Sequence, residues 1–132
     1  MKNYLYIGLA AISLLACKKE EKNETPKADP IFAIQNPTVG QVYNYGDTIR
    51  INGTISATYD MHGYNVKLFN VQTQQLLLNQ GYHTHGANFT VSEAWKNTVA
   101  DTAVLKLSFI AAIDHDGGIV TKEVNITCYP QQ

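Results

Sequence analysis

Apolar and polar residues alternate with a period of two along most of the chain after residue 30, and the period of an amphipathic helix is almost absent. The clearest run is TIRINGTISA (residues 48–57), in which Ile49, Ile51 and Ile55 share one parity and most polar residues take the other. Because successive side chains of a strand point to opposite faces, this run predicts a strand with one buried face. Comparable runs predict six further strands, at residues 31–34, 64–70, 75–83, 87–92, 104–113 and 119–129.

Seven short strands separated by glycine, asparagine and aspartate are typical of two packed sheets. The sequence therefore predicts an all-β fold over residues 30–132, a seven-stranded antiparallel immunoglobulin-like β-sandwich, with a small β-barrel as the alternative. A region of about a hundred residues suffices for one core and is too short for two. Only SEAWKNTV (residues 92–99) is compatible with a helical turn, and Trp95 within it is expected to pack against the core.

The N-terminal segment has a different pattern, in which Lys2 precedes an apolar run from Tyr4 to Ala16. This run is too short to span a bilayer as a helix and fits a secretory signal peptide over residues 1–16. It ends in LLAC (residues 14–17), which resembles the lipobox of bacterial lipoproteins. The resemblance implies cleavage before Cys17 and lipidation of that cysteine. An ordinary cleaved signal peptide is the alternative.

Residues 17–29 are predicted to be the lipidated cysteine followed by a flexible tether, because KKEEKNETPKAD is highly charged and lacks aromatic residues. A short charged run directly after the cysteine resembles Bacteroidota-type lipoproteins. That resemblance implies an outer-membrane lipid anchor, with the domain facing either the periplasm or the cell surface. The expected contact with the membrane is therefore through the lipid on Cys17.

The net charge and the position of Cys128 argue against two classes of function, nucleic-acid binding and cysteine chemistry. Removal of the signal peptide takes away one of ten basic residues, which leaves nine against eleven acidic residues. Because no basic face results, nucleic acid is not an expected partner. Cys128 shares the parity of Val124 and Ile126 in the last predicted strand, which indicates a buried and unreactive thiol.

The four histidines of the chain all fall near connections between predicted strands: His62 after the second, His83 and His85 after the fourth, and His115 after the sixth. If each connection reverses the direction of the chain, alternate connections lie at the same end of a sandwich. All four histidines are then expected to gather at one end. The third and sixth predicted strands should be antiparallel neighbours, which would bring His62 beside His115.

Clustered imidazoles predict a transition-metal site for copper or zinc, since both metals favour such ligands. Asp114 and Asp116 in DHDGG (residues 114–118) are reserve ligands, or partners that fix a ring nitrogen–hydrogen. Calcium bound by the two aspartates is a weaker alternative. A plain aspartate–glycine turn, in an ordinary polar rim of loops, is the alternative without a metal.

The sequence predicts a protein that is not an enzyme, because it offers no nucleophile elbow, no available reactive cysteine and no phosphate-binding glycine loop. The function expected is a cell-envelope lipoprotein that binds a transition metal through its histidine cluster. The alternative is a non-catalytic recognition or adhesion module. In that case Tyr59, Tyr64 and Tyr82, near the same end, would contact a glycan or an envelope protein.

Overall fold

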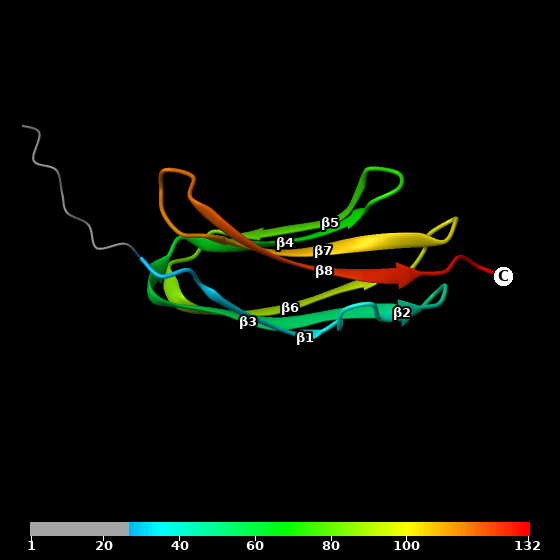
Figure 1. The fold of residues 1–132 in the computed structure, drawn as a ribbon, viewed down its shortest axis with the longest axis horizontal. Helices are drawn as coiled ribbons and strands as arrows, with labels where there is room; N and C mark the ends of the chain where they lie inside the picture. Colours follow the sequence, from blue (N-terminus) through cyan, green and yellow to red (C-terminus); the bar gives the residue numbers. More distant parts are fainter. Residues whose placement is uncertain (1–26) are drawn as a thin grey trace, which may run out of the picture.

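The computed structural model describes residues 27–132, and these form a sandwich of two β-sheets (Figure 1). The signal peptide, Cys17 and most of the tether lie outside the described residues, so the predictions for them stay predictions. Within residues 27–132 no helix is long and apolar enough to cross a membrane. The described part of the chain contains eight strands: β1 (Ile31–Asn36), β2 (Val42–Tyr43), β3 (Thr48–Met61), β4 (Gly63–Asn70), β5 (Gln75–Tyr82), β6 (Gly86–Lys96), β7 (Ala103–Ala112) and β8 (Ile119–Cys128).

The two sheets have the order β1-β3-β6 and β2-β8-β7-β4-β5. All strand pairs are antiparallel except β2 with β8, which is parallel. The predicted immunoglobulin-like β-sandwich is therefore confirmed, with eight strands in place of seven. The extra strand, β2, has only two residues and is too short to show alternation. The predicted neighbours β4 and β7 do pair, with Tyr64 opposite Ala111 and Leu68 opposite Leu107.

One local expectation is wrong. Residues 92–96 form the end of β6 and no helical turn, because they pair with the start of β3 from Asn52 back to Thr48. The ladder hydrogen bonds of a long partner strand outweigh the weak helical preference of this segment. Trp95 is partly buried and packs against the core, as its apolar character predicts.

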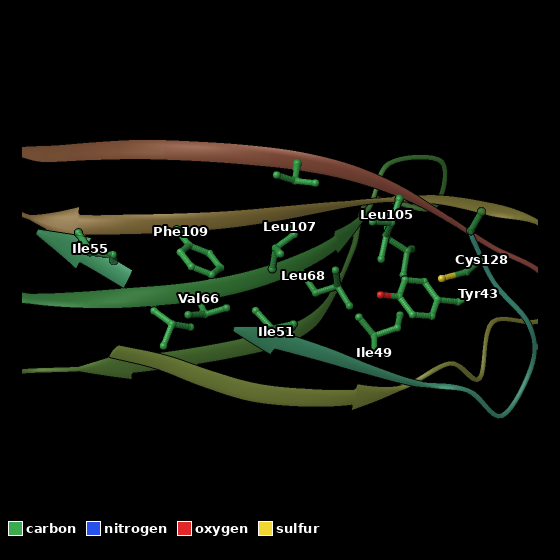
Figure 2. Close-up of a cluster of buried hydrophobic side chains, with 14 of the residues drawn as sticks. Tyr43, Ile49, Ile51, Ile55, Val66, Leu68, Leu105, Leu107, Phe109 and Cys128 are labelled. Atoms are coloured by element: carbon green, nitrogen blue, oxygen red, sulfur yellow. The ribbon is translucent and has the colours of Figure 1, made fainter. Parts of the chain in front are cut away.

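The core lies between the two sheets and consists mainly of the inward-facing apolar side chains of β3, β4, β6, β7 and β8, several of which are drawn in Figure 2. Ile49, Ile51 and Ile55 of β3 are completely buried, and Phe109 of β7 lies across from them with no exposed surface. Gly53 leaves room for this ring, because a Cβ atom there would lie 2.7 Å from Phe109 Cε2. All eight strands and this core lie within residues 31–128, so a chain that begins at residue 24 carries the complete sandwich.

Cys128 is completely buried, and burial raises the pKa of its thiol to about 11. Because the thiolate is the reactive form, we expect no reaction of the native chain from residue 24 with a thiol reagent at pH 7.5. In denaturant, one thiol should react per chain. Absorbance after addition of an aromatic disulfide reagent measures the number of reactive thiols per chain, in the native protein and in denaturant. Rapid labelling without denaturant would contradict the burial of this side chain.

Candidate metal centre

The four histidines lie in three connections that are separate in sequence, and these connections are at one end of the sandwich, on the left in Figure 1. His62 is the only residue between β3 and β4. His83 and His85 flank Thr84 in the connection from β5 to β6, and His115 lies in the loop between β7 and β8. The gathering predicted from alternating connections is therefore present in the structure.

The link that contains His62 is held tightly against neighbouring backbone. His62 N–H donates a hydrogen bond to the carbonyl oxygen of Ala112, at 2.8 Å. The next residue, Gly63, has a φ of +137°, a conformation that side-chain-bearing residues rarely adopt. A Cβ atom at Gly63 would overlap the carbonyl oxygen of Tyr82, so only glycine lets the chain pass this close to the end of β5. His62 is therefore fixed in position by its backbone.

Three of the four imidazoles form a compact triad. Ligand atoms of His62, His85 and His115 all lie within 4.8 Å of one another. The ring centre of His62 is 3.8 Å from that of His115 and 4.6 Å from that of His85, and the His85 and His115 centres are 5.7 Å apart. His62 is half-buried at the centre of the group, whereas His85 and His115 are exposed.

The electrostatic environment of His62 favours its neutral form. Burial lowers the pKa of this imidazole, and the neighbouring His115 and His85 lower it further because a charge on one ring disfavours a charge on the next. The Nδ1 atom of His62 is buried and has no hydrogen-bond partner among the described residues. A neutral imidazole with a free ring nitrogen is the form that binds a metal ion.

The other predicted ligands lie outside the triad. The ring of His83 is 5.4 Å from that of His85 and nearly perpendicular to it, at 86°. Asp114 uses its Oδ1 to accept backbone hydrogen bonds from Asp116, at 3.0 Å, and from Gly118, at 2.7 Å. Asp116 is exposed. The geometry at Asp114 is that of an aspartate–glycine turn, the alternative given by the sequence for this loop.

Lys27 is a neighbour of the centre that the sequence did not indicate. Its ammonium group lies 5.0 Å from the centre of the Tyr59 ring, and its charge contributes to the lowered pKa of His62. Lys27 belongs to the predicted tether, and no pattern in the sequence indicates that it would lie near Tyr59 and His62, more than thirty residues further along the chain. Only the course of the folded chain shows this contact.

Two of the three tyrosines near this end are engaged within the fold. The rings of Tyr64 and Tyr82 are stacked, with centres 4.8 Å apart. Tyr82 Oη donates a hydrogen bond to the carboxylate of Glu93, and Tyr64 Oη donates to the carbonyl oxygen of Thr90 at 3.3 Å. These contacts connect β4 and β5 of one sheet to β6 of the other. They give both side chains a structural role.

Together, the fold and the site define an immunoglobulin-type β-sandwich with a histidine triad in its end loops. No family model and no curated protein matches the sequence. Among solved structures, the fibronectin(III)-like modules of Clostridium thermocellum CbhA are similar, with a TM-score of 0.50 and 14% sequence identity. The similarity covers 77% of this chain and 99% of the module. At this identity the similarity concerns the fold alone.

Proposed function

We propose that this protein is a non-catalytic, lipid-anchored module of the cell envelope that binds one transition-metal ion, copper or zinc. The ligands are His62, His85 and His115. The observation that carries the proposal is the convergence of three imidazoles from three separate connections to within 4.8 Å. The lipobox-like LLAC segment supports anchorage through Cys17 to the outer membrane, with the domain at the periplasmic or the outer face.

The triad needs only a small contraction to bind a metal. Zinc–nitrogen bonds of about 2.0–2.1 Å in a tetrahedral site place ligand nitrogens roughly 3.3 Å apart. The exposed side chains of His85 and His115 can rotate toward the fixed His62, since loop side chains change rotamer at little cost. Three protein ligands leave one coordination position for water or an exchanging group. This open position suits capture and delivery of a metal ion.

Recognition through the three tyrosines, the alternative function, has less support. The Tyr64 and Tyr82 hydroxyls are committed to Thr90 and Glu93. Tyr59 is only partly exposed and lies beneath Lys27. Tyr82 keeps an exposed ring, but a partner at Tyr64 and Tyr82 would meet hydroxyl groups that are already bonded within the fold.

The proposal is tested by titrating the metal-free chain from residue 24 onward with zinc and with copper, followed by calorimetry and thermal unfolding. We expect one-to-one binding with a Kd of about 1 µM or tighter for at least one of the two metals. A metal concentration about 100 times the Kd should stabilise the fold by about 2.7 kcal/mol and raise the Tm by about 10 °C. Calcium is the matched control and should leave the Tm unchanged. Absence of binding by both transition metals would refute the proposal.

A further inference from the structure

A hollow lies at the end of the sandwich opposite the histidines, the end at which β4 turns into β5, on the right in Figure 1. It is bounded by the turn between β4 and β5 and by the connection from β6 to β7. β5 and β6 are edge strands of the two sheets, and the hollow lies where these edges end. Its volume of about 410 Å³ falls in the range of small-ligand sites, roughly 300–1,000 Å³.

The lining combines an apolar surface with uncharged polar groups. The apolar part includes Trp95 of β6 and Leu77 of β5, together with Val99, Ala100 and Ala103. Asp101 is the single charged residue among the described residues that line the hollow, and none of them is positively charged. The remaining polar groups are carboxamides and hydroxyls, contributed by Asn70, Gln72, Gln75, Thr73, Thr98 and Thr102.

Two of these carboxamides are fixed through their oxygen atoms, which leaves their nitrogen atoms for a ligand. Asn70 is only 7% exposed, and its Oδ1 accepts hydrogen bonds from the backbone N–H groups of Gln72 and Thr73, at 3.0 and 3.1 Å. The Oε1 of Gln72 accepts from the backbone N–H of Val104 at 3.1 Å. Neither side-chain nitrogen donates to any residue in the described part of the chain. Partly sheltered donors without a protein partner are the groups that a bound ligand satisfies.

The wall formed by the β6–β7 connection is held in place by Asn97. This side chain is completely buried, donates to the carbonyl oxygen of Tyr129 at 2.9 Å and accepts from the backbone N–H of Val99 at 3.2 Å. Its backbone N–H donates to the carbonyl oxygen of Asp47 at 2.8 Å. The hollow is therefore formed before any ligand arrives, which lowers the entropy cost of binding.

We propose that this hollow binds a neutral saccharide. An indole ring stacks on the apolar C–H face of a pyranose, while amide donors and a carboxylate pair with its hydroxyl groups. The absence of cationic side chains among the described lining residues disfavours phosphate or carboxylate ligands. The many polar groups disfavour a lipid chain, since each would lose its hydrogen bonds to water.

Trp95 is the only tryptophan of the chain, so its fluorescence reports directly on the hollow. The chain from residue 24 onward is first applied to an array of neutral oligosaccharides, and the bound sugars are then titrated while tryptophan emission is recorded. We expect at least one sugar to shift the emission with a Kd of about 1 mM or tighter. Asp101→Ala and Gln75→Ala, both at exposed positions, should each weaken binding by about tenfold, the loss expected for one hydrogen bond.

Controls separate this site from the metal centre. His85→Ala and the zinc-loaded protein should bind the sugar as the unmodified metal-free chain does, because the histidines lie at the other end. An array without any bound neutral sugar would overturn the proposal, as would binding that both Asp101→Ala and Gln75→Ala leave unchanged. Tighter binding of an uncharged Ser/Asn peptide than of every sugar would assign the hollow to protein recognition and would also overturn it.

Discussion

Replacement of His85 by alanine is expected to raise the Kd for zinc or copper by at least about 100-fold. Loss of a residue that only hydrogen-bonds to a metal ligand already weakens metal binding by about 10–100-fold, and loss of the ligand itself should weaken it more. His83→Ala is expected to change the Kd by less than about tenfold, the lower end of that range. The two residues are a matched pair, because both are exposed and they lie in the same short connection. The difference that matters for metal binding is that only His85 has a ligand atom in the triad. Calorimetric titration of each variant measures the difference.

The metal-free stability of both variants should match that of the unmodified chain, because neither side chain is buried. Circular dichroism melts without metal check this point before the affinities are compared. Equal losses in the two variants would show that His83 and His85 act together as a ligand pair, and the triad would then be wrong. No loss in either variant, with binding intact, would place the metal elsewhere.

The alternation of apolar residues was sufficient to predict the long strands and the all-β fold class. In β3 the predicted inward parity is buried, and Ile49, Ile51 and Ile55 have no exposed surface; the edge strand β5, in contrast, has no buried residue. Pairing between distant segments was not predictable in the same way. β2 exists because Val42 and Tyr43 lie parallel to the end of β8, and the end of β6 exists because β3 continues beside it. Neither interaction leaves a local pattern in the sequence.

The sequence predicts the end of the sandwich at which the four histidines gather, and the structure brings three of them into one compact triad. Strand count alone places all four histidines at one end, because every second connection returns there. The choice of His85 over His83 depends on where β5 ends and β6 begins, which alternation locates only to within a few residues. The position of Asp114 follows from the hydrogen bonds of its own turn. The aspartate–glycine turn was one of the alternatives predicted for DHDGG, and these hydrogen bonds show that Asp114 forms it.

Gly63 connects the stability of the fold to the metal centre, and Gly63→Ala is expected to impair both. The residue has a φ of +137°, and an added Cβ atom would overlap the carbonyl oxygen of Tyr82. That oxygen belongs to backbone held in the β4–β5 ladder, so the strands must separate to relieve the overlap. Strain of this kind costs about 1–3 kcal/mol, and displaced packing adds a similar amount, so we expect a loss of about 3 kcal/mol.

Gly40→Ala is the matched control, because Gly40 also has a positive φ, of +74°, and a Cβ atom there would meet nothing within 4 Å. Its expected cost is the conformational penalty alone, about 1 kcal/mol. Denaturant unfolding of the metal-free chains measures both losses. Metal affinity should fall in Gly63→Ala, since displacement of the link moves His62 away from His115, and should be unchanged in Gly40→Ala. Equal stability losses in the two variants would show that β4 and β5 tolerate the added atom, and the backbone could then no longer account for the position of His62.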